Sequence, residues 1–546
     1  MADKRYFISL LWVLLFIVAK AQTPISFTSD QGLSNTRIYS IAEDSRKNIW
    51  ICTQGGLNRY DGAKMNVYRH KQGEPGTLGH DMVTCVLELE PGCVLVGMET
   101  GVQAYDYDTD SFSDVPLLDG NGSAMTAHVI SMSRLSNGQV YVCTAGFGVY
   151  RLERDEDWGM WLERAQGLPQ SGVLTQMHED RKGRLWILES GGTVYCRVGK
   201  TTRNVARCPG GMEFCESSSG RLYLGTVHDG LLCYSEEEHR FVNVSPESRD
   251  FVLASVTAAP GGRILMATDG NGLQEYDERT GKTQLSHIRT YEYDVATSNV
   301  KDALVDSEGN TWVGVFWKGV LVMPHVSSGF MYVGRRSVQK NTIGTNCVTA
   351  ITGDGHGDLW LATDHCGLYH LSADGSRSEH FKPGVAGMPA TVMSILLDSG
   401  GGLWLGSSWS GVVRMDPATG ECTDISAWAK GGDKIPNAYA LAEDRHGHIW
   451  IGTNGNGLFR YEPGTHVLKH FSFRIDRSVE RGARVLHNVY IMSLLACGDS
   501  LYVGTADGLE VLRITAEGLS PVGRYLQKNI IRTMKKDGEG ALWAGT

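Results

Sequence analysis

The sequence predicts an all-β protein, made of a seven-bladed β-propeller followed by a second, incomplete β-propeller. The main observation is a segment, typified by "HIWIGTNGNGLFRY" (448–461), that recurs twelve times at a mean spacing of about 45 residues. That spacing is the length of a four-stranded propeller blade. Glycine is abundant at 67 residues and proline scarce at 15, as expected for many tight turns between short strands. A chain of 546 residues is also too long for one ordinary core.

The first 21 residues have the pattern of a secretory signal peptide. Lys4 and Arg5 precede the apolar run "YFISLLWVLLFIVA" (6–19), and "AKA" (19–21) supplies the small residues that a signal peptidase reads. A membrane-spanning helix needs about 20 apolar residues, so an uncleaved anchor is the less favoured alternative. No later stretch of the sequence is apolar enough to span a membrane. The sequence therefore predicts cleavage after Ala21 and export of the remainder.

Each repeat reads as four strands, and the copy around Trp450 shows how. Alternating alanines at 438, 440 and 442 fit an inner strand at a crowded axis, and "DRHG" (444–447) fits a hairpin turn. The second strand, "HIWIGT", has Trp450 at its centre, and "LFRYE" (458–462) is the third. These tryptophans are expected to be core residues between blades: Trp50, Trp186, Trp312, Trp360, Trp404, Trp450 and Trp543.

Two predicted strands lie outside the four-stranded repeats, and their positions indicate where each ring begins. "ISFTS" (25–29) can complete the unit that ends at "GVLVM" (319–323), which closes the first propeller over residues 22–325. "FMYVG" (330–334) opens a second ring over 326–546, of about 4.5 blades at the observed spacing. The twelfth unit stops at Thr546 after two strands, and an open ring exposes strand edges. The sequence is therefore interpreted as a piece of a longer protein.

The repeat resembles the two-component regulator propeller repeat. The shared pattern is D-x-x-G-x-[LI]-W-[IVL]-G-T-x-x-x-G-L-x-R-Y, and the resemblance covers nearly all of 23–546, with copies that lack the tryptophan at Leu95, Tyr141, Tyr223 and Leu265. The resemblance implies the periplasmic sensor region of a hybrid two-component sensor histidine kinase, mostly found in gut Bacteroidetes. It also implies further parts outside this sequence: an Ig-like domain, a membrane helix, a kinase and often DNA-binding regulatory domains. The full-length form is expected to be a homodimer in the inner membrane.

Motifs for catalysis, metals or cofactors are incomplete in every case. "DERTGKT" (277–283) lacks the first glycine of a phosphate-binding loop, and "DYDTD" (106–110) lacks the glycine and glutamate of a calcium loop. "HEDRK" (178–182) lacks the second histidine of a zinc protease, and "GSSWSG" (406–411) is not a nucleophile elbow. The sequence thus predicts no catalytic site, metal site or cofactor. A net charge of −10 argues against nucleic-acid binding.

The twelve cysteines are scattered, without metal-ligand spacing. Cys208 and Cys215 flank "PGGMEF" and could form a disulfide across a hairpin in an exported protein. Separate buried thiols are the favoured interpretation.

The turn between the second and third strands carries the candidate ligand-binding residues. It is small and polar in most copies, but in some it bears a large ring. In a propeller this turn borders the axial mouth, where aromatic rings can stack on sugars and amides can bond hydroxyls. Packing of the same rings on a neighbouring blade is the structural alternative. The candidates are Phe147, His228, Trp317, His365, Trp409, Asn454 and Asn456, with Phe316 next to Trp317.

Together these observations and the resemblance imply a periplasmic region that senses a glycan-derived oligosaccharide and passes the signal to a kinase missing from this fragment. Two alternatives from other classes stay open. One is a secreted propeller enzyme acting on polysaccharide, either a lyase or a glycosidase. The other is a non-catalytic interaction scaffold.

Overall fold

The structure is a computed structural model that describes residues 24–155, 159–169, 173–326, 333–335, 343–345, 347–375, 377–425, 435–471, 485–516 and 518–546. The predicted signal peptide lies outside the described residues. So does most of the strand predicted at 330–334, of which the described residues Val333 and Gly334 are not in a strand. The fold is all-β and propeller-like, built mainly from four-stranded sheets, with only short 3₁₀ turns besides.

The chain divides into two compact units, Met1–Met331 and Tyr332–Thr546. The domain boundary predicted between residues 325 and 326 falls a few residues before this division.

Among the described residues of the first unit, the strands form seven sheets, each made of strands that follow one another along the chain except where β1 joins β28–β30. Pairing is antiparallel throughout, apart from β10 with β15. The strands are β1 (Ile25–Phe27), β2 (Ile38–Glu43), β3 (Ile49–Thr53), β4 (Gly56–Tyr60), β5 (Met65–Tyr68), β6 (Val83–Glu90), β7 (Cys93–Met98), β8 (Val102–Asp106), β9 (Ser111–Val115), β10 (Leu117–Leu118), β11 (Ala124–Met125), β12 (Val129–Arg134), β13 (Val140–Thr144), β14 (Gly148–Arg154), β15 (Met160–Arg164), β16 (Leu174–Glu179), β17 (Leu185–Glu189), β18 (Thr193–Val198), β19 (Thr201–Arg207), β20 (Gly211–Glu216), β21 (Leu222–Thr226), β22 (Leu231–Ser235), β23 (Arg240–Asn243), β24 (Leu253–Ala259), β25 (Arg263–Thr268), β26 (Leu273–Asp277), β27 (Lys282–Leu285), β28 (Val300–Val305), β29 (Thr311–Val315) and β30 (Gly319–Met323). Three 3₁₀ turns accompany them: η1 (Ser29–Gln31), η2 (Pro246–Ser248) and η3 (Val295–Thr297).

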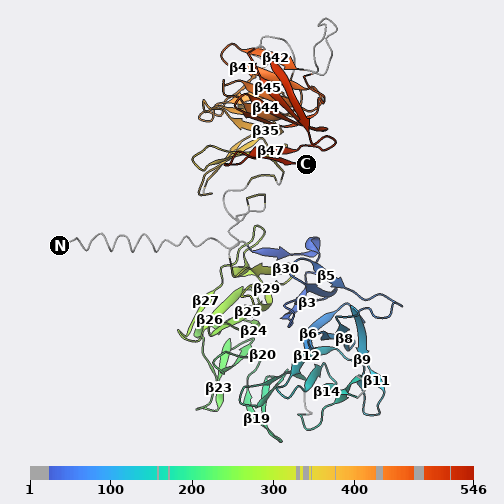
Figure 1. The fold of residues 1–546 in the computed structure, drawn as a ribbon. Coiled ribbons are helices and arrows are strands. Elements are labelled where there is room, and N and C mark those ends of the chain that lie inside the picture. Colours follow the sequence, from blue (N-terminus) through green and yellow to red (C-terminus); the bar gives the residue numbers. More distant parts are fainter. Residues whose placement is uncertain are drawn as a thin grey trace, which may run out of the picture. The chain divides into compact units, whose positions relative to one another are not determined.

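The sheets of the first unit follow one another in chain order around a ring (Figure 1). The first strands of neighbouring sheets are bonded through side chains, as when Ser131 Oγ donates to Thr175 O at 2.6 Å. The last sheet returns to the first, because Ile41 N donates to Asp302 Oδ2 at 2.7 Å. The N-terminal strand β1 pairs with β30, with Ile25 opposite Val322. The pairing of these two segments was predicted from the sequence and is confirmed.

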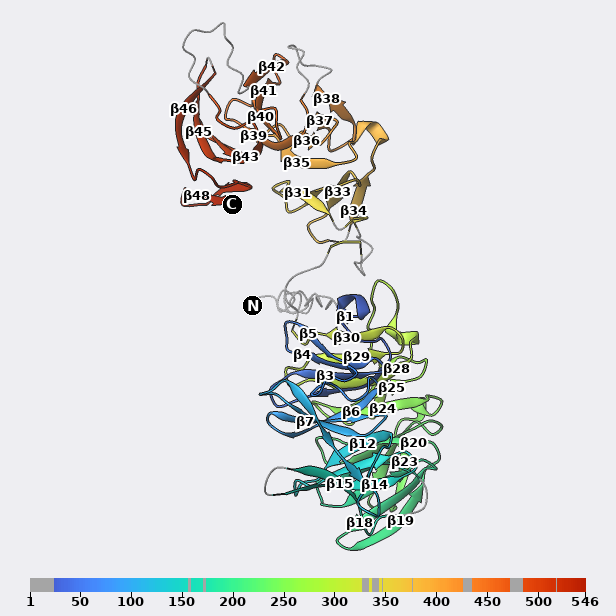
Figure 2. The same cartoon turned by 90° about the vertical axis from the view of Figure 1, so that its right-hand side faces the viewer.

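The second unit is built from the same kind of sheet, in a succession from β31–β34 to β47–β48 (Figure 2). Its described strands form four sheets of four strands and one of two. They are β31 (Val348–Gly353), β32 (Leu359–Thr363), β33 (Leu368–Leu371), β34 (Ser378–Phe381), β35 (Val392–Leu397), β36 (Leu403–Ser407), β37 (Val412–Met415), β38 (Cys422–Asp424), β39 (Ala438–Glu443), β40 (Ile449–Thr453), β41 (Leu458–Glu462), β42 (Val467–Phe471), β43 (Ile491–Cys497), β44 (Ser500–Thr505), β45 (Gly508–Ile514), β46 (Leu519–Tyr525), β47 (Thr533–Lys536) and β48 (Leu542–Gly545), with one 3₁₀ turn, η4 (Val385–Gly387).

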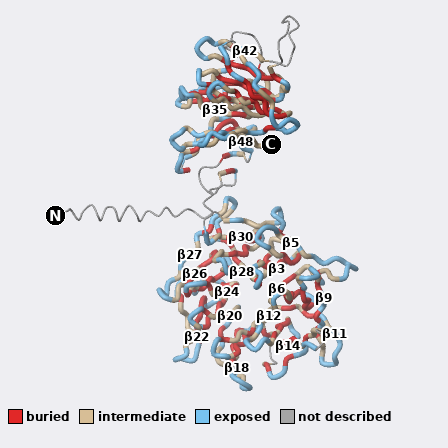
Figure 3. The backbone as a smooth tube through the Cα atoms, in the orientation of Figure 1, coloured by how far each residue is buried: buried red, intermediate tan, exposed pale blue. Residues whose placement is uncertain are grey.

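The core lies between adjacent sheets, and the turns are exposed (Figure 3). One cluster joins Trp50 of β3 to Val83, Val94 and Tyr105 of the next sheet. Six of the repeated tryptophans are buried in this way: Trp50, Trp186, Trp312, Trp360, Trp404 and Trp450. Trp543 differs from the prediction, because its side chain is 68% exposed. It lies in the two-stranded sheet, and no later described strand packs on it.

The aspartate in the first turn of the repeat holds both the turn and the tryptophan. Asp444 Oδ1 accepts backbone N–H groups from His446 and His448, and its Oδ2 accepts the indole N–H of Trp450 at 2.8 Å. The capping role was expected from the sequence, whereas the bond to the indole six residues later was not. The same indole bond recurs in the pairs Asp44–Trp50, Asp180–Trp186, Asp306–Trp312, Asp398–Trp404 and Asp537–Trp543.

The glycine before the repeated threonine is required by packing between sheets. A Cβ on Gly452 would lie 2.5 Å from Ile491 Cγ2 of the next sheet, and one on Gly225 would lie 2.6 Å from Val256 Cγ1. Such overpacking costs about 1–3 kcal/mol. We therefore expect Gly452→Ala to lower the free energy of unfolding by about 1–3 kcal/mol in urea denaturation. Gly464→Ala is the control, since a Cβ there meets nothing within 4 Å; equal losses in both variants would contradict the packing explanation.

All twelve cysteines are free. Cys208 and Cys215 are both buried thiols, so the disulfide considered from the sequence is not formed.

Candidate functional site

Each sheet has one end at which a first strand begins and the turn between the second and third strands lies. In the sheet of β28–β30, Val300 at the start of β28 pairs with Val315, which pairs with Gly319. The segment entering the first strand is therefore beside the second turn. We call these segments and turns, taken together within one unit, its rim.

A β-bulge recurs where the first strand enters the sheet. In eleven described first strands the register shifts between the first and third residues, as between Ile38 and Ser40 and between Val300 and Asp302. A bulge adds one residue and re-aims its side chain. The extra residues include Tyr39 of β2 and Lys301 of β28. Each bulge thus adds one side chain to the rim, and this side chain differs from sheet to sheet. The sequence pattern did not predict the bulge.

The predicted rim residues of the first unit lie on three different sheets. Phe147 is 48% exposed on the turn between β13 and β14, and His228 is exposed between β21 and β22. Trp317 is 58% exposed between β29 and β30 and packs against Phe316, with ring centroids 5.4 Å apart. The structure gives no contact between the rings of these three sheets.

The predicted rim residues of the second unit are also distributed over three turns. Trp409 is 90% exposed between β36 and β37. The His365 ring is tied to its neighbour, with Nδ1 2.6 Å from Asp364 Oδ1. Asn454 and Asn456 are half-buried, and their backbones are held by Asn437 O and Thr453 Oγ1. Neither asparagine side-chain amide bonds another described residue, so both remain available to a ligand.

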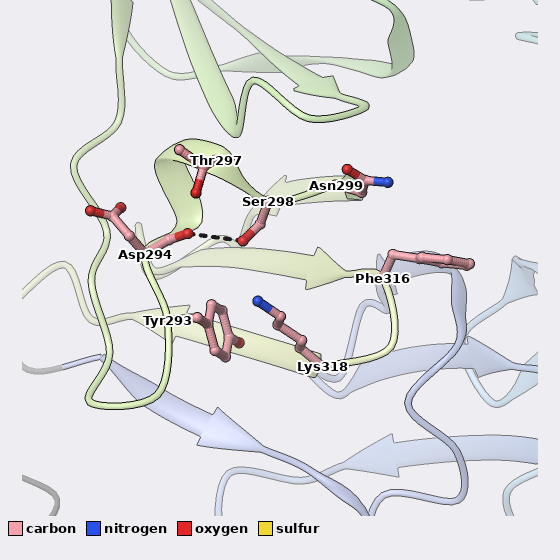
Figure 4. Close-up of a pocket in the computed structure, with 7 residues that line it drawn as sticks. All are labelled: Tyr293, Asp294, Thr297, Ser298, Asn299, Phe316 and Lys318. Atoms are coloured by element: carbon pink, nitrogen blue, oxygen red, sulfur yellow. Dashed lines mark hydrogen bonds between the residues drawn. The ribbon is translucent and has the colours of Figure 1, made fainter.

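A pocket of about 460 Å³ lies in the rim beside the turn between β29 and β30 (Figure 4). We call it the β29–β30 pocket. The turn contributes Phe316 and Lys318, and the segment entering β28 contributes the remainder. Its lining residues are Tyr293, Asp294, Thr297, Ser298, Asn299, Phe316 and Lys318.

Three cations lie near the two aromatic rings of this pocket. Lys318 Nζ lies 4.0 Å from the centroid of the Tyr293 ring, and Lys301 Nζ lies 5.0 Å from that of Phe316. The Arg37 guanidinium is 6.0 Å from the Phe316 centroid. Burial and the nearby Glu292 raise the pKa of Tyr293, so its phenol stays protonated. Among the residues in and beside this pocket, the sequence predicted only Phe316 and the adjacent Trp317 as candidates.

In the described part of the chain, no cluster of three metal-ligating side chains occurs. His178 lies in strand β16 rather than on a helix. Residues 278–281 form the turn between β26 and β27, and Asp106 Oδ1 caps the turn between β8 and β9 by accepting from Asp108 N and Thr109 N.

Two segments of the chain, residues 32–55 and 434–455, match the profile of the family described as two component regulator propeller. Each segment spans an aspartate-capped turn and the buried tryptophan that follows it. These two segments are therefore similar to two-component regulator propeller repeats.

Solved structures with this fold include extracellular domains of sensor systems. The extracellular domain assigned to the hybrid two component system BT3049 from B. thetaiotaomicron aligns over 96% of this chain and 76% of its own, with 19% identity and a TM-score of 0.53. The domain assigned to the hybrid two component system BT4673 from the same organism aligns over 95% and 82%, with 16% identity and a TM-score of 0.44. PorZ, a surface component of the type-IX secretion system of Porphyromonas gingivalis, aligns over 95% and 79%, with 13% identity and a TM-score of 0.39. Among curated proteins, none matches the chain in sequence. At these identities the likeness establishes the fold alone.

In four of the turns that carry candidate residues, a threonine hydroxyl donates to a glycine carbonyl. Val315 and Ser407 take the place of this threonine in the turns of Trp317 and Trp409. Thr453 Oγ1 donates to Gly457 O at 2.7 Å and accepts from Asn456 N at 3.1 Å. Gly457 has a φ of 77°, which a glycine adopts without strain. The glycines of "GTNGNG" thus form a hairpin turn between β40 and β41 rather than a phosphate-binding loop. These bonds hold the backbone of the turn, and the residues between threonine and glycine differ from copy to copy.

No helix in the described residues is long and apolar enough to cross a membrane.

Proposed function

We propose that this chain is the periplasmic ligand-sensing region of a hybrid two-component sensor and that its rim binds a glycan-derived oligosaccharide. The observation that carries the proposal is the exposure of Trp317 and Trp409 on rim turns. Exposed rings cost free energy in water, and a sugar ring can cover them. The repeat family and the fold shared with the BT3049 domain support the sensing role.

The proposal includes an architecture for the whole chain. Residues 1–21 are a signal peptide, and residues 22–325 form a complete seven-bladed propeller, supported by the β1–β30 pairing and the Asp302–Ile41 contact. Residues 326–546 form an incomplete propeller of about 4.5 blades. Ile351 of β31 and Trp543 of β48, in the outermost sheets of the second unit, are exposed as expected for unfilled neighbouring positions.

Signalling in this proposal passes through a kinase that the 546 residues do not include. The full-length protein would be a homodimer anchored in the inner membrane. A ligand can shift such a dimer between two arrangements only by binding one of them more tightly.

Removing a rim tryptophan is expected to weaken oligosaccharide binding. Trp317→Ala or Trp409→Ala should lower affinity about tenfold for whichever propeller binds, since one well-packed aromatic contact is worth about 1–1.5 kcal/mol. The measurement is calorimetry of the full chain against a panel of neutral and acidic oligosaccharides. Trp543→Ala is the matched control, because this ring is equally exposed but lies within a strand away from the rim turns.

Three outcomes of this experiment would contradict the proposal. If no oligosaccharide binds, the ligand of this chain is not an oligosaccharide. An equal loss of affinity in Trp543→Ala and in the rim variants would show that the rim is not the binding site. Turnover of an oligosaccharide by the chain would favour the secreted-enzyme alternative.

A further inference from the structure

Three cations lie at or near the two aromatic rings of the β29–β30 pocket, in a chain whose net charge is −10. Lys318 lines the pocket beside Tyr293, and Arg37 and Lys301, outside the lining, lie near Phe316. Of the three cations, Lys301 has an acidic partner, Asp269, at 3.9 Å. Among the described residues no carboxylate lies within 4 Å of Lys318 Nζ. This gathering of cations is unexpected on an acidic surface unless an anion binds there.

The one acidic residue that lines the pocket does not neutralise Lys318. Asp294 Oδ1 accepts the backbone N–H of Ala296 at 2.9 Å, which caps η3. Figure 4 shows the Asp294 carboxylate pointing away from Lys318. The ammonium group of Lys318 is instead held over the Tyr293 ring, where it faces the pocket beside Ser298.

The uncharged side chains of the pocket have unused hydrogen-bonding capacity. The Tyr293 hydroxyl is buried and has no hydrogen-bond partner, an arrangement that is costly unless a ligand satisfies it. The Thr297 hydroxyl and the Asn299 amide bond no other described residue. Ser298 is already committed, because its Oγ donates to Asp294 O at 2.9 Å. A ligand for this pocket therefore needs several hydroxyl groups as well as a negative charge.

We propose that the β29–β30 pocket binds an anionic saccharide, with its carboxylate or sulfate at Lys318 and a sugar face against Phe316. Tyr293, Thr297 and Asn299 bond its hydroxyls, and Arg37 and Lys301 add long-range attraction. Trp317, next to Phe316 on the turn, extends the stacking surface toward solvent. This inference rests on the proposed saccharide-binding function and narrows its ligand class. A pocket of about 460 Å³ falls within the range of small-ligand sites.

The test compares three disaccharides by calorimetry on the full chain: one with a uronic acid, its carboxyl-reduced neutral counterpart, and one with a sulfate ester. We expect at least one anionic disaccharide to bind about tenfold more tightly than the neutral one, with the preference falling as salt is raised. The uronic acid and sulfate arms identify which anion the pocket takes.

Variants of Lys318 test whether the preference for an anionic disaccharide arises in this pocket. Lys318→Met keeps the apolar stem and should abolish the preference for the anionic sugar, whereas Lys318→Arg should retain most of it. Lys64→Met, at an exposed lysine on the turn between β4 and β5, is the control and should change nothing. Tyr293→Phe should weaken binding of neutral and anionic sugars alike.

The outcomes separate this inference from the function on which it rests. If oligosaccharides bind but the neutral and anionic forms bind equally, the anionic pocket is refuted and the sensing proposal stands. Persistence of the preference in Lys318→Met also refutes the pocket. If no oligosaccharide of the wider panel binds, both proposals fail.

Discussion

Replacement of Asp444 by alanine is expected to lower the free energy of unfolding by about 3–4 kcal/mol, because the change leaves buried donors without an acceptor. The Asp444 carboxylate is fully buried and accepts bonds from His446 N, His448 N and Trp450 Nε1. The Trp450 ring is itself fully buried, so water cannot replace the lost bond. The measurement is urea denaturation of the full chain, followed by tryptophan fluorescence.

The same unit contains a matched control for this prediction. Asp537 makes the same bond to Trp543, at 2.7 Å, but this ring is exposed. Water can therefore take over the bond, and Asp537→Ala should cost less than about 1 kcal/mol. Equal losses in the two variants would show that burial is not the cause. Asp444→Asn keeps an acceptor for the turn and should fall between them.

The pKa of Asp444 gives this interaction a pH dependence. Burial alone would raise the pKa, but bonds from Trp450 and from the backbone of residues 448 and 446 outweigh it and hold the pKa below its usual value. The folded state therefore binds this proton less readily than the unfolded state. The stabilisation is complete above the unfolded pKa and is lost as pH falls through the folded one. In Asp444→Ala this acid-sensitive contribution should disappear.

Much of the fold could be predicted because it depends on a short sequence pattern that recurs along the chain. The consensus of the repeat places an aspartate, a tryptophan, a glycine and a threonine at fixed distances, and each of the four residues has a local task. Even the long-range pairing of β1 with β30 followed from an unpartnered strand at residues 25–29. Trp543 shows the limit of that reasoning. Its burial would require a further sheet beside it, and the repeat pattern alone does not say whether one is present.

The β29–β30 pocket could not be predicted in the same way, because its parts are far apart in the sequence. Arg37 reaches Phe316 only because the ring brings β2 beside β28. Lys301 is aimed by a β-bulge that has no clear sequence signal. The rim turn did identify Phe316 and Trp317, since large rings are uncommon at that position of the repeat. Charge in the segments entering the first strands is the additional signal that would have pointed to this pocket.

Replacement of Glu213 by glutamine is expected to stabilise the first unit at pH 8, which is unusual for the loss of a charged group near a propeller axis. Glu213 of β20 accepts the backbone N–H of Val256 at 3.1 Å, and Ser255 Oγ bonds Asp302 Oδ1 at 2.9 Å beside it. Burial, and secondarily the charge of Asp302, raise the pKa of Glu213 to about 7. Burial likewise raises the pKa of Asp302 to about 6.

The direction in which stability changes with pH depends on whether the folded or the unfolded state binds the proton of Glu213 more tightly. Between about pH 4.5 and pH 7 the folded state keeps a proton on Glu213 that the unfolded state has lost, so stability falls as pH rises through this range. Above pH 7 folding must hold the ionised carboxylate in this partly buried site beside Asp302, which lowers the stability of the folded state. Glutamine mimics the protonated acid and can still accept from Val256 N. Glu213→Gln should therefore melt several degrees higher than the parent at pH 8 and nearly equal to it at pH 4.5.

Thermal denaturation of the full chain at these two pH values tests this prediction, with Glu247→Gln as the control. Glu247 is an exposed residue of the same unit, in η2, and its replacement should leave the melting temperature unchanged at both pH values. Asp302→Asn should also raise the melting temperature at pH 8, because it removes the neighbouring charge that opposes ionisation of Glu213. Destabilisation of Glu213→Gln at pH 8 would show that Glu213 is ionised and favourably held in the folded state. Equal stabilisation at both pH values would show that the gain does not come from the ionisation of Glu213.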